Sequence, residues 1–333
     1  MKNNSSIKYI PDLIRSQHRK DLNNYISPIF CGGLGNNLFQ MATAISYSID
    51  SGFNCIFGYW SSYNSISKLP ENHNSEWAGK PNPFFSKWAG WKSKNDFNLK
   101  DLFPKIEWFD NLDCTANGDF STIKERFEWG FDFDTGTEGI YKPLDILPGE
   151  QFYGYFFNKK YWHHNRNQIL DILAFDPHRV EYVKSKYSKV LTEKPTVSLN
   201  LRIIDKSVAS ESEMFERSKH LEQSEFIQNA VKFFGRNHRF IVTSSNCEVA
   251  KNMIYSNNDL KNYDFYFIDE DFDIQLIIST MCKNHILTNS TFSFWSCYLD
   301  KNMENSVVVF DESFETLHSK EMTPIEWIKL KTI

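Results

Sequence analysis

The sequence predicts an α/β fold made of two halves, each a parallel, doubly wound sheet, that face a central cleft. Three observations predict it. The length of 333 residues suits two domains, and a glycine-rich turn joins an apolar stretch to a helical pattern near residue 33. After residue 196, short apolar stretches alternate regularly with helical patterns. Such alternation is typical of a parallel sheet, and ligands of these sheets bind at the carboxyl ends of the strands.

The composition limits the classes of function. Hydrophobic residues make up 41% and aromatic residues 16% of the chain, as expected of a packed globular protein. The net charge of −5, with both signs interspersed, argues against a nucleic-acid partner and favours small ligands. The six cysteines form no C-x-x-C pair, so we expect reduced thiols. No stretch is apolar enough for a signal peptide or a membrane span, and we expect a cytoplasmic protein.

The first half opens with a polar, broken stretch and then the motif "ISPIFCGGLGNNLFQMATAISYSIDSG". Its pattern predicts a short strand, a glycine turn, and a helix that Gly52 stops. At the start of this helix, Asn36 and Asn37 can cap it and still offer donors outward to a ligand; the alternative is a plain tight turn. Residues 60–135 are rich in Trp, Asn, Ser and Pro, which predicts long loops that hold a substrate.

The second half is the more regular one. After a helical connector between Pro177 and Pro195, which we take as the domain link, strands and helices alternate. In order, the predicted strands are "TVSLNLRI", "RFIVTSS", "YDFYFI", "HILTNS" and "SVVVF", and the helices between them are "SEFIQNAVKFFG", "CEVAKNMI", "DIQLIISTMC" and "TFSFWSCYLD".

One candidate anion site lies in "ILTNSTFSFW", where a strand runs into a helix. Asn289, Ser290, Thr291 and Ser293 surround the first turn with hydroxyl and N–H groups, at the end where the helix dipole is positive. A well-capped helix is the simpler interpretation, but three hydroxyls are more than a cap requires.

A second candidate lies in "VSLNLRIIDKS". Asn200 and Arg202 share one face of the predicted strand, and Asp205 follows the strand end. An arginine at the carboxyl end of a central strand is costly unless it meets an anion, which is either a ligand or a structural partner such as Asp205.

Three blocks carry a resemblance to a known family. "GGLGNNLFQMA" is very similar to the G-G-L-G-N-Q-L-F-Q-Y-A signature of the α-1,2-fucosyltransferases, glycosyltransferase family 11. "LTNSTFSFWSCYL" resembles that family's N-S-T-F-S-W-W-x-x-W-L block, and "GYFFNKKYW" its G-Y-F-Q-S-x-K-Y-F element. The blocks lie in the family's order and span residues 31–300. On this resemblance, the chain is identified as a divergent member of the family.

The resemblance implies a metal-independent enzyme of carbohydrate metabolism with a GT-B fold of two Rossmann-like domains. It would move a sugar, L-fucose from GDP-fucose above all, to a hydroxyl of a glycan acceptor, with inversion, as a galactoside α-1,2-fucosyltransferase does. Residues 1–26 would form an N-terminal arm, residues 27–190 the acceptor-side domain with its Trp-rich loops, and residues 191–333 the nucleotide-sugar domain. No cofactor and no metal ligand are implied.

The family's roles carry over by position. Arg202 matches the first arginine of the family's H-x-R-R-x-D motif and would clamp the diphosphate, while Ser290, Thr291 and Phe292 match the block that holds the β-phosphate. The donor-binding set implied is Asn200, Arg202, Ser244, Asn289, Ser290, Thr291 and Phe292. The glycine turn, with Gly33, Gly35, Asn36 and Asn37, would lie beside the transferred sugar and the acceptor.

This chain departs from the family pattern within H-x-R-R-x-D. The family's His is Asn200 here and its second Arg is Ile203. In relatives an acid pairs with the guanine base of the donor, whereas "VTSSN" offers Ser244. These changes leave two alternatives open: the same fold with a different nucleotide-sugar donor, or a catalytically inactive carbohydrate-binding relative. For the general base we choose Asp205 by position, although it could equally orient Arg202.

Other acidic and histidine residues have simpler explanations. His163 and His164 are expected on a helix surface. Asp132 and Asp134 have a D-x-D spacing but no strand context for a metal site, and "DEDFD" at residues 269–273 is explained by acids at a helix N-terminus.

Overall fold

The computed structural model describes residues 25–28, 33–58, 99–106, 108–109, 126–127, 141, 143–147, 151–203, 225–317 and 321–330. Two compact units divide these residues: the first includes every described residue up to Ala174, and the second begins at Phe175. Most of the predicted arm and of the Trp-rich loops, including Asp132 and Asp134, lies outside the described residues, as does Asp205.

The first unit is built on a small parallel sheet. Its four strands lie in the order β2-β1-β6-β5, and β3 pairs with β4 in a separate two-stranded sheet. The bounds are β1 (Tyr25–Pro28), α1 (Leu34–Ser51), β2 (Asn54–Cys55), β3 (Phe57–Gly58), α3 (Leu99–Leu102), β4 (Trp108–Phe109), β5 (Arg126–Phe127), β6 (Gln151–Tyr153), the 3-10 helices η4 (Lys159–Tyr161) and η5 (His163–Asn165), and α4 (Arg166–Ile172).

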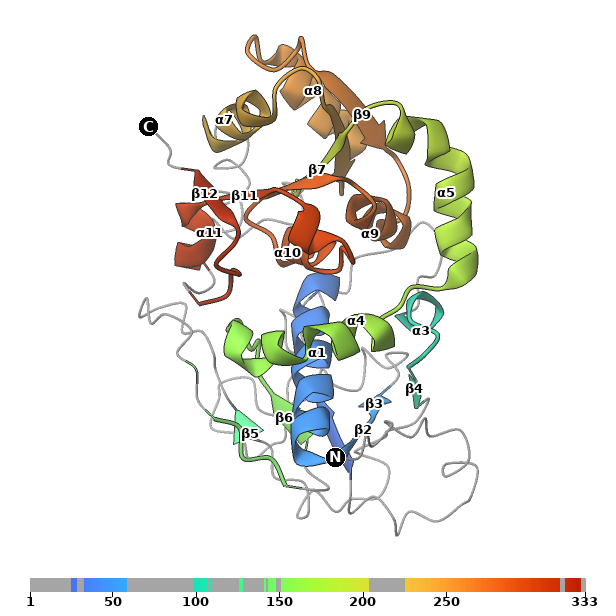
Figure 1. Cartoon of the computed structure of the whole chain (residues 1–333), viewed down its shortest axis with the longest axis vertical. Helices are drawn as coiled ribbons and strands as arrows, with labels where there is room; N and C mark the ends of the chain where they lie inside the picture. Colours follow the sequence, from blue (N-terminus) through green and yellow to red (C-terminus); the bar gives the residue numbers. More distant parts are fainter. Residues whose placement is uncertain are drawn as a thin grey trace, which may run out of the picture. The chain divides into compact units, whose positions relative to one another are not determined.

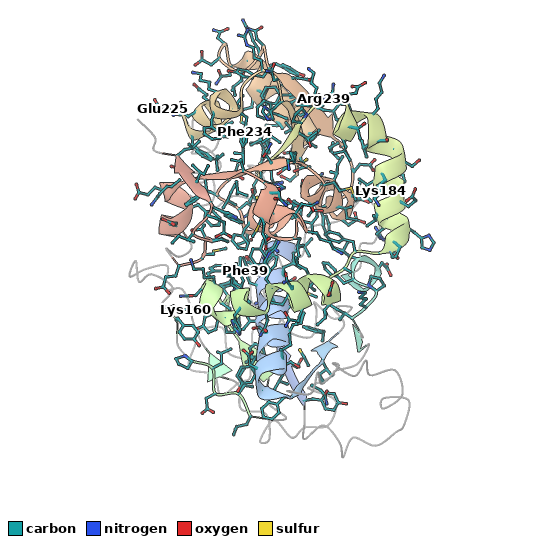
Figure 2. All side chains as sticks on the ribbon, in the orientation of Figure 1. Phe39, Lys160, Lys184, Glu225, Phe234 and Arg239 are labelled. Atoms are coloured by element: carbon teal, nitrogen blue, oxygen red, sulfur yellow. The ribbon has the colours of Figure 1, made fainter. Side chains whose placement is uncertain are left out.

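Helix α1 is the predicted helix after the glycine turn, and it forms the centre of this unit's core (Figure 1). Phe39, labelled in Figure 2, is fully buried and packs its ring against Phe157 at 5.1 Å and Trp162 at 5.6 Å between centroids. The helix ends where predicted, because Gly52 adopts a left-handed φ of 76° and its N–H bonds the Ser48 carbonyl at 3.0 Å. The "GYFFNKKYW" element thus packs on the helix that follows the "GGLGNN" turn.

The second unit contains a six-stranded, fully parallel sheet in the order β9-β8-β7-β10-β11-β12 (Figure 1). In chain order this is strand order 3-2-1-4-5-6, the Rossmann arrangement. The bounds are α5 (Pro177–Thr192), β7 (Thr196–Leu201), α7 (Glu225–Phe234), β8 (Arg239–Ser244), α8 (Cys247–Ser256), β9 (Asp264–Ile268), α9 (Phe272–Thr280), β10 (Asn284–Leu287), α10 (Thr291–Tyr298), the 3-10 helix η6 (Met303–Asn305), β11 (Val308–Asp311), α11 (Glu312–Leu317) and β12 (Ile328–Leu330).

The α/β class is confirmed, and each unit has a parallel sheet as each domain of a GT-B enzyme does. All nine predicted strands and helices from β7 to β11 are present within a few residues of their expected bounds. The sequence pattern missed the last helix and strand, α11 and β12, which complete the edge of the sheet.

The boundary between the units precedes α5, whereas the sequence placed it within the last turn of this helix, between residues 190 and 191. Asp176 caps α5, accepting the Arg179 N–H at 3.0 Å, and Pro177 fills the first helical position. The helix then bonds the segment before α9: Glu270 accepts hydrogen bonds from Tyr187 at 2.7 Å and from Lys186. Other side chains of α5, such as Lys184, are exposed (Figure 2). Therefore α5 belongs to the second unit and is not a free connector.

Candidate functional site

The topological switch point of the second unit lies between β7 and β10. These strands are neighbours, but the chain continues from β7 toward β8 and β9 on one side and from β10 toward β11 and β12 on the other. Loops leaving the two carboxyl ends therefore diverge, and ligands of such sheets bind in the crevice they leave. Arg202 directly follows β7, and Asn289 and Ser290 follow β10. The fold thus brings the two candidate anion motifs of the sequence to adjacent strand ends.

Ser290 forms the N-cap position of α10, but its side chain makes no capping hydrogen bond. Its carbonyl accepts the first intrahelical bond, from Phe294 N at 3.0 Å, so the N–H groups of the first turn have no partner within the helix. Within the described ranges, neither the Ser290 nor the Thr291 hydroxyl takes part in a side-chain hydrogen bond. The start of α10 is therefore a cluster of N–H and hydroxyl donors at the positive end of a helix dipole, which is suited to an anion.

Ser293 differs from the expectation that it would face a ligand. It is fully buried, its hydroxyl accepts the Thr288 N–H at 3.1 Å, and the same oxygen lies 3.5 Å from the Ile286 carbonyl. The reason is helical geometry: position 293 is on the inner side of the first turn, under the strand end. Ser293 braces the turn and is not part of the donor cluster.

Asn200 and Ser244 lie at the carboxyl ends of β7 and β8 and are both buried. The Asn200 side-chain amide donates to Thr243 Oγ1 on β8 at 3.1 Å. The Ser244 hydroxyl accepts the Asn246 N–H at 3.1 Å and donates to the Asn246 carbonyl at 3.2 Å, which closes the turn into α8. Their predicted role in holding the donor stays a prediction, and these contacts show that both groups also serve the fold.

Arg202, Asn289 and Phe292 are half-buried at the same end of the sheet. Next to Arg202, Ser245 ties the end of β7 to that of β8, because its hydroxyl donates to the Ile203 carbonyl at 2.6 Å and accepts the Ile203 N–H at 3.3 Å. This anchoring fixes the backbone from which the Arg202 side chain extends.

The glycine turn of the first unit is placed differently from the expectation. The helix begins at Leu34, so Gly33 is the N-cap, with φ −81° and no side-chain cap, and Asn36 and Asn37 lie inside the helix. The Asn37 amide donates inward to Gln40 Oε1 at 3.2 Å, and Gln40 in turn donates to the Gly154 carbonyl at 3.0 Å. The expected capping by the two asparagines is wrong, and Asn37, only 2% exposed, supports the core instead of pointing outward.

There is room for a side chain at Gly33. A Cβ built there would meet no atom within 4 Å, and the φ of −81° is open to any residue, so neither packing nor backbone conformation requires the glycine. Gly35 is buried within the first turn of α1, and Asn36 is half-buried. A ligand group that approaches the first N–H groups of α1 would account for the missing side chain at this position.

The histidine and acidic motifs that the sequence set aside have structural partners. His164 lies in η5 and bonds Asp50 at 2.7 Å, with both side chains half exposed near the far end of α1 from the glycine turn. In the "DEDFD" run, Asp271 is the N-cap of α9, and the buried Asp273 forms an ion pair with Arg179 of α5. The helix-terminus explanation of that run is confirmed.

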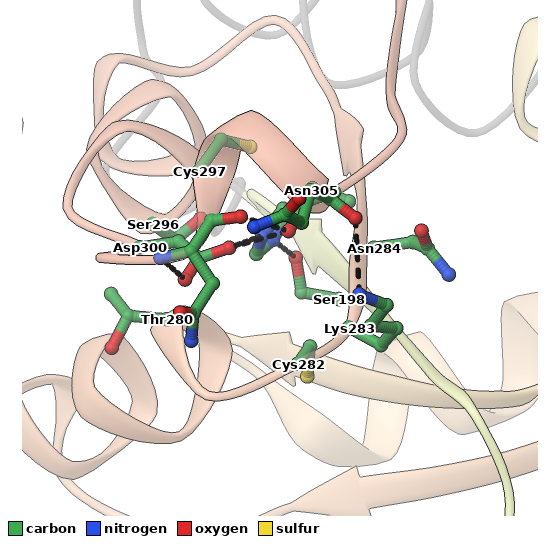
Figure 3. A network of polar contacts seen from close by, with 12 residues as sticks. Ser198, Thr280, Cys282, Lys283, Asn284, Ser296, Cys297, Asp300 and Asn305 are labelled. Carbon is green, nitrogen blue, oxygen red and sulfur yellow. Dashed lines mark hydrogen bonds and ion pairs between the residues drawn. The ribbon is translucent and has the colours of Figure 1, made fainter.

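A buried Ser–His–Asp arrangement, which the sequence pattern did not indicate, links β7 and β10 to the segment after α10; Figure 3 shows two of its members, Ser198 and Asp300. Ser198 Oγ lies 2.7 Å from His285 Nδ1, and His285 Nε2 lies 3.2 Å from Asp300 Oδ2. Asp300 also accepts bonds from Ser306 Oγ and from the Asn302 N–H, each at 2.7 Å. Because Ser198 is 2% and His285 0% exposed, no substrate reaches this serine, and the arrangement is a structural brace.

The charge state of this brace follows from its hydrogen bonds. Burial would raise the pKa of Asp300, but the bonds from His285, Ser306 and the Asn302 N–H outweigh it and hold the pKa below its usual value. Nearby, burial raises the pKa of the Cys282 thiol to about 12, and that of Cys297 well above its usual value. The two thiols therefore stay protonated at neutral pH, and among the described residues they are free cysteines.

Within the described ranges, no group of three or more His, Cys, Asp or Glu side chains is placed to hold a metal ion. Likewise, no helix in the described part is long and apolar enough to cross a membrane.

Comparison with known proteins defines the class. A model of glycosyl transferase family 11 matches residues 144–331, more than half of the chain and nearly all of the second unit. The chain is thus a glycosyltransferase, an enzyme that transfers a glycosyl group from a nucleotide sugar. It belongs to glycosyltransferase family 11, which confirms the resemblance drawn from the three sequence blocks.

Individual relatives are distant. The chain is 24% identical over 318 residues to an alpha-1,2-colitosyltransferase of Escherichia coli, covering 90% of this chain and 97% of the relative. Among solved structures, FUT1 of Arabidopsis thaliana with GDP matches at 10% identity, covering 86% of this chain and 70% of that one, with a TM-score of 0.44. The fucosyltransferase NodZ from Bradyrhizobium matches at 10% identity, covering 83% and 92%, with a TM-score of 0.43. At 10% identity, these two solved structures do not bear on the substrate.

Proposed function

We propose that this enzyme transfers L-fucose, or a closely related deoxy sugar, from its GDP donor to a hydroxyl of a glycan with inversion of the anomeric centre. Family membership supports glycosyl transfer. The observation that carries the finer proposal is the convergence of Arg202 and the Ser290–Thr291 turn at the switch point of the Rossmann sheet. A dinucleotide or sugar-nucleotide diphosphate is the ligand chemistry that such a site selects.

The catalytic proposal concerns the leaving group. As the bond between the sugar and the β-phosphate breaks, negative charge grows on the phosphate oxygens. The N–H groups at the start of α10, the Ser290 and Thr291 hydroxyls and the Arg202 guanidinium would stabilise that charge without a metal, since fixed donors need no reorganisation during the reaction. Metal independence and a cytoplasmic location stay predictions.

The acceptor side of the proposal rests on fewer observations. We propose that the backbone at Gly33 and Gly35 contacts the transferred sugar or the acceptor, on the ground that a side chain at Gly33 would meet nothing. Asp205 is kept as the proposed base, by its position in the sequence after β7. Terminal galactosides are the acceptors to test first, because the resemblance is to α-1,2-transferases that act on them.

A colitosyl donor is the second candidate, and the name of the Escherichia coli relative favours it. Colitose differs from fucose by the loss of one ring hydroxyl, so a diphosphate site of the kind described here would hold both donors equally. The enzyme would distinguish the two donors by a group that hydrogen-bonds the hydroxyl found only in fucose. When colitose binds, that group would have no partner, and an unpaired polar group in a buried pocket costs binding free energy.

The test measures GDP binding by titration calorimetry and sugar transfer from GDP-fucose and GDP-colitose to galactosides, with and without EDTA. Arg202→Ala should lower transfer by about a hundredfold or more, the effect of removing one oxyanion donor. Arg236→Ala, an exposed arginine before the amino end of β8, is the matched control and should leave transfer unchanged.

Four outcomes would contradict the proposal. Full transfer by Arg202→Ala would remove the arginine from the site. Loss of activity with EDTA would show that transfer needs a metal ion, against the proposed metal-free mechanism. Binding of another nucleotide in place of GDP would change the donor class, and glycan binding without any transfer would favour the inactive carbohydrate-binding alternative.

A further inference from the structure

The two strands that carry the proposed diphosphate site separate at their carboxyl ends. On one side, β7 pairs with β8 up to Leu201↔Ser244. On the other side, the register of β7 with β10 ends two residues earlier, at Leu199↔Ile286. The gap that opens between Asn200 and the segment after β10 is the crevice of the switch point. Its width must be fixed by contacts other than main-chain pairing.

Thr288 bridges this gap. Its hydroxyl donates to the Asn200 carbonyl at 2.7 Å, at the position where the main-chain register with β10 has ended. The residue is 1% exposed, so water does not compete for the bond. In effect, one side-chain hydrogen bond continues the link between the two strands past the end of their pairing.

The backbone of Thr288 is held as firmly as its side chain. Its N–H donates to the buried Ser293 hydroxyl at 3.1 Å, and its carbonyl accepts the Ser290 N–H at 2.7 Å. Thr288 therefore joins three elements: the end of β7 through its hydroxyl, the first turn of α10 through its N–H, and the N-cap residue through its carbonyl.

We propose that Thr288 is a positioning residue, whose hydroxyl bond to the Asn200 carbonyl sets the distance between Arg202 and the N-terminus of α10. This rests on the proposed function, since it concerns the same diphosphate site. Arg202 is two residues beyond Asn200, and Ser290 two residues beyond Thr288, so little chain separates the bond from the two groups it aligns. Misplacing charge-stabilising donors by about 1 Å can cost a hundredfold in rate.

The variant that tests this is Thr288→Val, which keeps the shape and removes the hydroxyl. We expect kcat for sugar transfer to fall by about tenfold or more while the KM for the nucleotide sugar changes by less than about threefold, because the loss concerns alignment more than contact. Thr288→Ser keeps the hydroxyl and should retain kcat within about threefold of wild type.

The chain offers a matched control at the other end of the same strand pair. Thr196, the first residue of β7, is equally buried, and its hydroxyl accepts the N–H of Lys283, the residue before β10, at 3.1 Å. Thr196→Val also removes a bond between a buried threonine hydroxyl and the main chain, here at the other end of the same strand pair and far from the crevice. It should lower the melting temperature as Thr288→Val does and leave kcat unchanged.

The outcomes separate this proposal from the proposed function. If wild type transfers sugar and Thr288→Val keeps kcat within twofold, or if Thr196→Val lowers kcat as much, positioning by Thr288 is overturned. If wild type neither binds GDP nor transfers sugar, the proposed function itself fails, and the positioning role with it. Should Thr288→Val not fold, Ser293→Ala removes the other anchor of the same residue; a fall in kcat at constant KM supports the proposal, and an unchanged kcat overturns it.

Discussion

Replacing Asp300 by Asn should destabilise the second unit strongly, because the buried carboxylate has three hydrogen-bond partners. It accepts bonds from His285, Ser306 and the Asn302 N–H, and its side chain is 3% exposed. Removing one partner of a buried, hydrogen-bonded ionic group costs about 3–5 kcal/mol. For a unit of this size, about 2–4 °C of melting temperature corresponds to each kcal/mol, so a fall of roughly 10 °C is expected.

The assay is thermal unfolding followed by circular dichroism and calorimetry, with Asp259→Asn as the control. Asp259 pairs with Lys232 at 3.2 Å on the surface, with both side chains about half exposed, and such a pair contributes less than about 1 kcal/mol. If Asp300→Asn melts within about 2 °C of wild type, the carboxylate is not the brace described here.

The pH dependence gives a second check on the same variant. The folded pKa of Asp300 is lowered, so its ionised form stabilises the fold at pH values above the unfolded pKa of about 3.9. That contribution is lost as the pH falls through the folded pKa. The difference in unfolding free energy between wild type and Asp300→Asn should therefore stay large at neutral pH and shrink below about pH 4. A difference that stays the same in acid would contradict the assigned charge state.

Three further changes have expected outcomes. Gly52→Ala should lower the free energy of unfolding by about 1–2 kcal/mol, because φ is 76° at this position. Gly33→Ala, at the other cap of α1 with φ −81°, should lower it little, and urea unfolding of the two variants measures the difference. Glu270→Gln should lower the free energy of unfolding by about 1–2 kcal/mol, because it weakens the hydrogen bonds that attach α5. Amide exchange in α5 should then be faster than in wild type, and equal exchange rates would refute this role of Glu270. His164→Ala should leave kcat/KM for transfer unchanged and cost less than about 1 kcal/mol, since its pair with Asp50 is half exposed; loss of transfer would make it a functional residue.

Local patterns were enough to predict most of the second unit. Short apolar runs between turn residues identified the strands, and Gly235, with φ 77°, ends α7 as the sequence indicated. The pattern failed at α11 and β12, where the final strand of three residues has an exposed, weakly apolar pattern. An edge strand that buries little surface leaves little periodicity in the sequence.

Side-chain direction was the property that local pattern could not give. Asn37 was expected to face outward, but it donates to Gln40, which reaches Gly154, 114 positions further along the chain. Ser293 was expected among the ligand hydroxyls and instead braces Thr288. In both cases a polar residue follows a turn that is rich in polar groups, and only the packing around it decides whether its partner is a ligand or the protein.

By itself, the sequence determined the family, the α/β class and the two motifs that hold the candidate diphosphate site, because these depend on residue identity and on short-range periodicity. Tertiary structure alone decided which strand ends are neighbours. Arg202 and Ser290 are 88 positions apart and lie at adjacent strand ends only because β7 and β10 pair at the centre of the sheet. It also decided that α5 belongs with the second unit, and that Ser198, His285 and Asp300 form a buried brace. Such long-range pairings depend on which buried surfaces meet, and no local segment contains that information.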